Sequence, residues 1–96
     1  MIFSFHPKAE KELNEAIKYY NQCKNDLGFE FARDVYSAIQ EIISFPQAWT
    51  NISINARRCL LKRFPYGIIY NVDKAEVFII AVMQLNKKPD YWIKRA

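Results

Sequence analysis

The chain has 96 residues, of which 51% are hydrophobic and 25% are charged, and its formal net charge is +4. This size and apolar content predict one compact domain spanning residues 1–96. The longest apolar run, residues 77–83, is far shorter than the ~20 residues that a membrane span requires, and the N-terminus lacks the pattern of a signal peptide. We therefore expect a cytoplasmic protein with no membrane partner.

Metal and phosphate chemistry is disfavoured by the same composition. The chain has one histidine, His6, and two isolated cysteines, Cys23 and Cys59, which form no zinc-type pair. Only two glycines are present, Gly28 and Gly67, so no glycine-rich phosphate loop exists. We expect no metal, no small-molecule cofactor and two buried thiols.

The first half of the chain predicts a short strand followed by two helices. Residues 2–5 are a strand candidate, and Pro7 suits the first position of a helix, with His6 as a partly exposed capping residue. The break at residues 23–28 is short, so the helices should form an antiparallel hairpin that ends at Pro46. Apolar residues recur at helical spacing, first at Ala9, Leu13, Ala16, Ile17 and Tyr20, then at Phe31, Ala32, Val35, Ala38, Ile39 and Ile42.

The second half predicts strands. After a loop at residues 47–55, three strands are expected at 57–64, 67–73 and 76–84, joined by short turns as an antiparallel meander. Strict alternation puts Phe78, Ile80 and Val82 on one side of the last strand and Val77, Ile79 and Ala81 on the other. A strand that is apolar on both sides should be central or covered on both faces.

The simplest topology joins these parts into an α+β domain. A chain that returns through two helices enters the next strand antiparallel to the first. We therefore expect the N-terminal strand, the α-helical hairpin and the three-stranded antiparallel meander to form one antiparallel sheet of four strands with a short C-terminal element.

Charge is unevenly distributed along the chain. Residues 1–55 contain five Lys or Arg against seven Asp or Glu, whereas residues 56–96 contain nine against three. Such segregation points to a polyanion or an acidic partner, with an ordinary solvated basic face as the alternative.

The basic half also contains the residues best suited to binding. Alternation puts Arg58 and Lys62 on one side of their strand and Arg57 and Arg63 on the other, so we expect these cations to flank the core with their charged ends in water. Guanidinium groups suit phosphate oxygens, and aromatic rings can stack on bases. A metal-independent endoribonuclease also needs an acid and a base, which arginine does not supply. The candidates are Arg57, Arg58, Lys62, Arg63, Lys87, Lys88, Tyr91 and Trp92.

Four segments carry a family resemblance. They are FHPKAEKELNEAIKYY, GFEFARDVYSAIQEI, RRCLLKRFPYGIIYNV and VFIIAVMQLNKKPDYWIKR. In this order they resemble the small toxins of the RelE/ParE superfamily from bacterial type II toxin–antitoxin modules, also known as plasmid stabilisation or addiction modules. The resemblance spans nearly the whole chain. It implies the fold described above and a co-expressed antitoxin with a flexible segment that wraps the toxin.

The superfamily contains two kinds of activity. RelE-like members cleave mRNA on the ribosome, whereas ParE-like members inhibit DNA gyrase without a nuclease site. Many relatives have histidine where this chain has Gln84, which cannot exchange a proton near neutral pH. The FPYGIIY and KKPDYW segments look ParE-like, and we favour that branch.

Two alternatives remain open at this point. As a ribosome-dependent nuclease, the chain would use Arg58, Lys62 and Arg63 with Gln84 and Tyr91, its partners being ribosome and mRNA. The sequence is also compatible with a toxin copy that has lost its toxicity and only binds its antitoxin. As a gyrase inhibitor, it would bind antitoxin or target through the eight basic and aromatic candidates named above. Tyr91 and Trp92 also suit a core or lid role.

Overall fold

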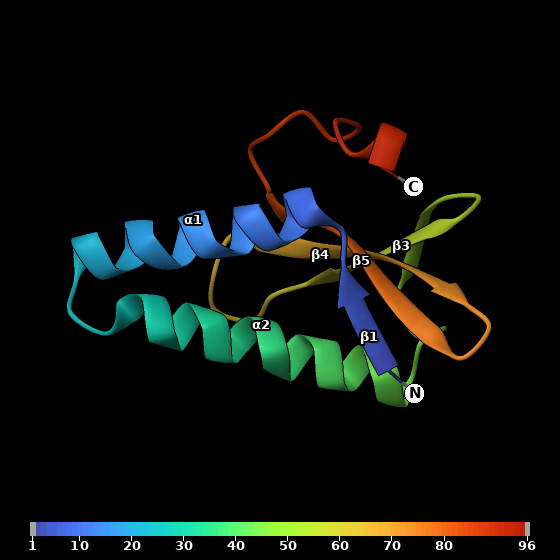
Figure 1. Ribbon diagram of the computed structural model, residues 1–96, viewed down its shortest axis with the longest axis horizontal. Helices are drawn as coiled ribbons and strands as arrows, with labels where there is room; N and C mark the ends of the chain where they lie inside the picture. The colour runs from blue at the N-terminus through green and yellow to red at the C-terminus, as the bar shows by residue number, and fades with distance from the viewer. Residues whose placement is uncertain (1, 96) are drawn as a thin grey trace.

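A five-stranded mixed sheet with two α-helices on one face makes up the structure, a computed structural model that describes residues 2–95 (Figure 1). None of its helices is long and apolar enough to cross a membrane within those residues. The elements are β1 (Ile2–Phe5), α1 (Pro7–Cys23), α2 (Leu27–Ser44), β2 (Thr50–Ser53), β3 (Ala56–Leu60), β4 (Tyr66–Asp73), β5 (Glu76–Gln84) and the 3₁₀-helix η1 (Ile93–Arg95).

The start of α1 is as predicted. His6 is the N-cap residue, and its Nδ1 accepts a hydrogen bond of 3.0 Å from the backbone N–H of Lys8. Pro7 occupies the first helical position, where its missing N–H costs nothing. The single histidine therefore has a structural role at the helix start.

The two helices are held close together at Gly28. A Cβ atom at this position would collide with the carbonyl oxygen of Ile17 and with the side chain of Asn21 on α1. The N–H of Gly28 donates to the Asn21 Oδ1 at 2.8 Å. Only a residue without a side chain allows α2 to begin this near α1, which fixes the geometry of the predicted hairpin.

The predicted direction of the first strand is wrong. The strand order is β1-β5-β4-β3-β2, and β1 runs parallel to β5, while the other three pairings are antiparallel. The reason is the extra strand β2 at Thr50–Ser53, a segment predicted to be part of a loop. One additional reversal of the chain inverts every later strand, so β5 returns parallel to β1. The α+β class and the meander are confirmed, but the sheet is mixed.

Strand β5 is central, as its composition predicts. Its neighbours are β1 and β4, and both of its faces are covered. The core on the helix-covered face of the sheet contains Ala9, Leu13, Phe31, Val35, Ile39, Ile42, Ile68, Tyr70, Val77, Ile79 and Val82. The core on the opposite face contains Ala56, Ile69, Ile80, Ala81, Met83 and Trp92, so the C-terminal segment supplies the cover that the sequence requires there.

A β-bulge interrupts the predicted alternation along β5. Ile69 of β4 pairs with Ala81, but the next residue, Tyr70, pairs with Ile79, which leaves Ile80 as an extra residue. Ile80 and Ala81 consequently both contribute to the core beneath Trp92. The predicted assignment of side chains to faces therefore holds only up to the bulge.

Two further expectations need correction. Strand β3 ends at Leu60, so the predicted strand at 57–64 is too long, and Lys62 and Arg63 lie in the connection to β4. Of the two thiols that were expected to be buried, Cys59 is buried and Cys23 is exposed. Burial raises the pKa of the Cys59 thiol to about 11.

We predict that Gly28→Ala destabilises the protein. Alanine is favoured over glycine in a helix interior by roughly 1 kcal/mol, but the added Cβ has no space here and overpacking costs about 1–3 kcal/mol. Urea denaturation of Gly28→Ala, with Gln40→Ala on the exposed side of α2 as control, measures the difference. A variant as stable as the wild type would show that the hairpin can open at this point.

Candidate functional site

Lys62 and Arg63, the basic residues that follow β3, form ion pairs with acidic residues of α2. The Lys62 Nζ lies 3.0 Å from Glu41 Oε1, and an Arg63 guanidinium nitrogen lies 2.8 Å from Glu30 Oε1. The backbone N–H of Arg63 also donates to Asp34 at 3.1 Å. The hydrogen bond to Glu41 raises the pKa of Lys62, and the hydrogen bond from Arg63 lowers the pKa of Glu30. Both cations thus connect the sheet to the helix hairpin.

Arg57 and Arg58 lie on opposite faces of β3 and have different surroundings. Arg57 Nη1 donates to the carbonyl oxygens of Gln47 at 3.2 Å and Trp49 at 2.7 Å, so it holds the connection between α2 and β2. The Arg58 side chain crosses Gly67 on the sheet face opposite the helix hairpin. No ion pair involves Arg58 within residues 2–95.

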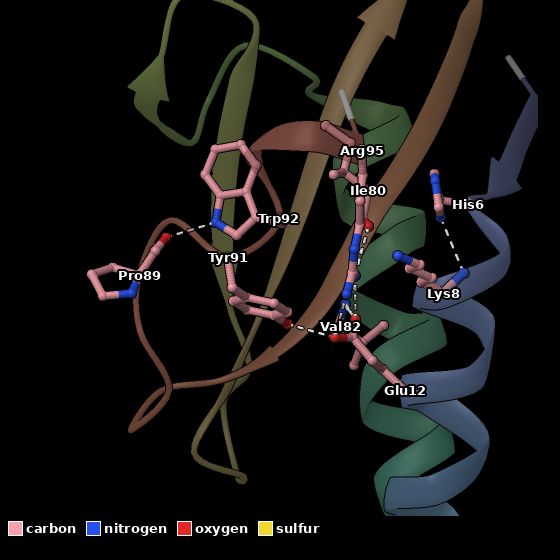
Figure 2. A network of polar contacts seen from close by, with 9 residues as sticks. All are labelled: His6, Lys8, Glu12, Ile80, Val82, Pro89, Tyr91, Trp92 and Arg95. Carbon is pink, nitrogen blue, oxygen red and sulfur yellow. Dashed lines mark hydrogen bonds and ion pairs between the residues drawn. The ribbon is translucent and has the colours of Figure 1, made fainter.

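The most extensive polar network joins α1 to the C-terminal segment (Figure 2). The Glu12 carboxylate accepts a hydrogen bond of 2.7 Å from the Tyr91 hydroxyl and one of 3.1 Å from the Val82 N–H. Arg95 donates to both Glu12 oxygens, at 2.9 and 3.2 Å, and to the Ile80 carbonyl at 3.3 Å. The side chains of Glu12 and Arg95 are only 15% and 12% exposed. This is a nearly buried, fully paired bidentate interaction.

The network lies where β5 lacks a neighbour. β1 pairs with β5 only as far as Ile79, whose carbonyl accepts from the N–H of His6. Beyond that point, in the part of the chain that the structure describes, the Val82 N–H and the Ile80 carbonyl bond to Glu12 and Arg95 in place of a strand. A side-chain pair thus completes the edge of the central strand and fixes the C-terminal segment.

Three of the candidate site residues meet in one pocket. A hollow of about 150 Å³ between α1 and the end of the sheet is lined by Gln84, Lys87 and Tyr91, together with Tyr66 and Glu15. The Lys87 Nζ lies 5.4 Å from the centroid of the Tyr91 ring. Arg58, Lys62 and Arg63 are not among the residues lining it, so the structure does not bring all the residues assigned to a nuclease into this pocket.

The last two candidates have contrasting roles. Lys88 is exposed in the loop after β5. Trp92 is 3% exposed, belongs to the core on the face opposite the helix hairpin, and donates from Nε1 to the Pro89 carbonyl at 2.7 Å. Trp92 therefore packs as a lid residue.

Comparisons with known proteins place the chain in a family. Residues 3–87 match the profile described as the ParE toxin of the type II toxin–antitoxin system, parDE. The chain belongs to the ParE toxin family. It is similar to a solved chain of the chromosomal ParDE toxin–antitoxin system from P. aeruginosa, with a TM-score of 0.71 and 15% identity over 90% of this chain and 97% of that one. That structural match shows the shared fold. None of the curated proteins matches the sequence significantly.

The pocket at Gln84 of this ParE-family toxin is also lined by the carboxylates of Glu12 and Glu15, of which Glu12 is bound by Arg95 and Tyr91. The glutamine amide does not titrate near neutral pH. Burial, followed by the hydrogen bond to Glu12, raises the pKa of Tyr91 well above its ordinary value. The phenol therefore stays protonated and committed to the Glu12 carboxylate. No cluster of three or more potential metal ligands occurs in residues 2–95.

Glu12 of the toxin is a key residue of this network that was not among the candidates predicted from the sequence. A carboxylate on a helix is ordinarily solvated, but the side chain of this one is only 15% exposed. A signal was available in its position, three residues after Ala9 and four before Ala16, both buried. A carboxylate at the border of an apolar helix face requires a partner, but the partner, Arg95, lies 83 positions away in the chain.

We predict that Glu12→Ala destabilises the toxin by about 3 kcal/mol, because removing one member of a buried ion pair leaves the other uncompensated. Glu15→Ala, at an exposed position on the same helix, is the control and should change stability by less than about 0.5 kcal/mol. Urea denaturation measures both, and near-ultraviolet circular dichroism reports the packing of the aromatic side chains, Trp49 and Trp92 among them. Equal stability of the two variants would contradict a structural role for Glu12.

Proposed function

We propose that this toxin is a non-catalytic inhibitor of DNA gyrase that acts in the cytoplasm and is neutralised by its cognate antitoxin. The chain's membership of the ParE family supports this proposal. The observation that carries it is the pocket at Gln84: the glutamine does not transfer a proton, the Tyr91 phenol of raised pKa is bound to Glu12, and Glu12 is in turn bound by Arg95.

Cleavage of ribosome-bound mRNA is the weaker candidate. It requires cations directed at one phosphate together with an acid and a base. Lys62 and Arg63 are paired with acids of α2, whereas Gln84 and Tyr91 lie in the hollow beside α1. The cations are thus paired on α2, while the other two candidates lie beside α1.

We propose that the target-binding surface includes Arg58 and its neighbour Leu60. Both lie over Gly67 on the sheet face opposite the helix hairpin, and Leu60 is 52% exposed. Arg58 forms no ion pair with a carboxylate of residues 2–95, and it lies next to an exposed aliphatic side chain. Such a combination is suited to the centre of a protein interface. The exposed Lys87 and Lys88 add positive charge from the loop after β5.

We predict that the purified toxin inhibits supercoiling by gyrase and does not cut ribosome-bound mRNA. Gln84→His should change neither result by more than a few fold, since no proton transfer is required at this position. Had the protein been a nuclease that lacks its histidine, the substitution would raise cleavage by roughly 10²–10⁴-fold.

Gln84→Asn, which keeps the amide, is the control. Primer extension on ribosome-bound mRNA and a supercoiling assay are run on all three proteins. Codon-positioned cuts by the wild type with unchanged supercoiling would replace gyrase by mRNA as the target, and no effect in either assay would indicate a copy that has lost toxicity.

We predict that Arg57→Ala affects stability and that Arg58→Ala affects activity. Arg57→Ala should lower the free energy of unfolding by about 1–3 kcal/mol, because two carbonyl groups lose a charged donor. Arg58→Ala should leave stability nearly unchanged and weaken inhibition of gyrase. Lys94→Ala removes an exposed cation of η1 and serves as the control. Full inhibitory activity of a folded Arg58→Ala variant would remove Arg58 from the proposed surface.

A further inference from the structure

The end of the sheet farthest from Gln84 contains a large hollow. It measures about 940 Å³ and lies at the turn between β4 and β5, with Ile2, Asn71, Asp73, Glu76 and Phe78 among the residues that line it. Tyr66 pairs with Gln84 at one end of the β4–β5 ladder and Asp73 pairs with Glu76 at the other. The hollow is therefore separated from the pocket at Gln84 by the whole length of β4, roughly 24 Å at ~3.4 Å per residue.

Strand β4 has an unpaired edge beside this hollow. Its pairing with β3 ends at Tyr70 opposite Arg57, while its pairing with β5 continues to Asp73. Among the described residues 2–95, the segment from Asn71 to Asp73 has no strand partner on the β3 side. A second hollow of about 230 Å³ next to Pro46 also reaches Asn71 and Val72. Free space thus adjoins the edge on two sides.

The side chains around the hollow are apolar and acidic. Ile2 is 67% exposed and Val72 is 39% exposed, so both present apolar surface that is available to a partner. Neither Asp73 nor Glu76 forms an ion pair within residues 2–95. Glu76 accepts a hydrogen bond of 2.8 Å from the Ser4 hydroxyl. Within the described chain Lys74 is the one cation in the lining, so the two carboxylates outnumber it.

This chemistry fits an extended peptide with an aliphatic side chain beside a lysine or arginine. The backbone of such a segment pairs with an unpaired strand edge, its apolar side chain enters a hollow, and its cation reaches the carboxylates. An exposed apolar edge is also an aggregation hazard for a free protein. A partner that stays bound for most of the protein's lifetime removes that hazard.

We propose that the end of the sheet formed by Ile2, Val72, Asp73, Glu76 and Phe78 binds an extended segment of the cognate antitoxin that carries a basic residue next to an aliphatic one. The inference rests on the assignment of the chain as a toxin with a cognate antitoxin, and it does not depend on gyrase as the target. This contact lies at the opposite end of the sheet from the surface proposed for the target.

The test compares two double variants with the same change in net charge. Asp73→Asn with Glu76→Gln removes the carboxylates of the hollow, and Glu10→Gln with Asp90→Asn removes two exposed carboxylates elsewhere. The amide oxygen that Glu76→Gln introduces can still accept from the Ser4 hydroxyl, so the fold should persist. Val72→Arg is a third variant that places bulk and positive charge at the unpaired edge.

Calorimetric titration of each full-length toxin with its antitoxin measures affinity at low and high salt, and a supercoiling assay measures inhibition of gyrase by the free toxin. We expect the Asp73/Glu76 variant and Val72→Arg to bind antitoxin at least ~10-fold more weakly, with a smaller salt dependence for the former. The control pair should bind as the wild type does, and gyrase inhibition should be the same for all four proteins.

Antitoxin affinity equal to that of the control pair would overturn the inference. A loss of gyrase inhibition with antitoxin binding retained would also overturn it, because the hollow would then serve the target. If the wild-type toxin does not inhibit gyrase at all, the proposed function fails, whereas the antitoxin titrations still decide the inference.

Discussion

The burial of β5 on both faces is the constraint on which the rest of the structure depends. This strand is apolar along both sides, so it needs a neighbour on each edge and a layer over each face. The helix hairpin covers one face and Trp92 of the C-terminal segment covers the other. Strand β1 pairs with only part of one edge of β5, and the Glu12–Arg95 pair forms hydrogen bonds with backbone groups farther along that edge. The N- and C-terminal parts of the chain are thereby brought together around one strand.

The consequence for function is a division of the cations into two classes. Arg57, Lys62, Arg63 and Arg95 bind groups of the same chain, and of the three ion pairs only that of Arg95 is nearly buried. Arg58 lacks such a partner among residues 2–95. A basic segment in a sequence therefore contains both structural and available charges, and only the contacts distinguish them. Electrostatic attraction of a partner depends on the second class.

The helices, the meander and the central position of β5 could be predicted because each depends on local periodicity. The helix start at Pro7 with its His6 cap and the C-terminal element are further examples. The direction of β1 could not be predicted, because it depends on the short segment Thr50–Ser53, which forms a strand only by pairing with β3. The role of Glu12 depends on Arg95, which no local pattern connects to it. The bulge at Ile80 likewise follows from pairing between strands and not from the residues of β5 alone.

The parallel pairing of β1 with β5 has a consequence for synthesis of the protein. Ser4 binds Glu76, 72 positions later, and Glu12 binds Arg95, 83 positions later. Contacts between residues this far apart in the chain form slowly, and only after both residues have been synthesised. A nascent chain that has reached Ser44 contains both helices of the hairpin but not yet strand β5 or Trp92. The Glu12–Arg95 pair therefore forms only after Arg95 has been synthesised, so the edge of β5 and the fold around it are completed last.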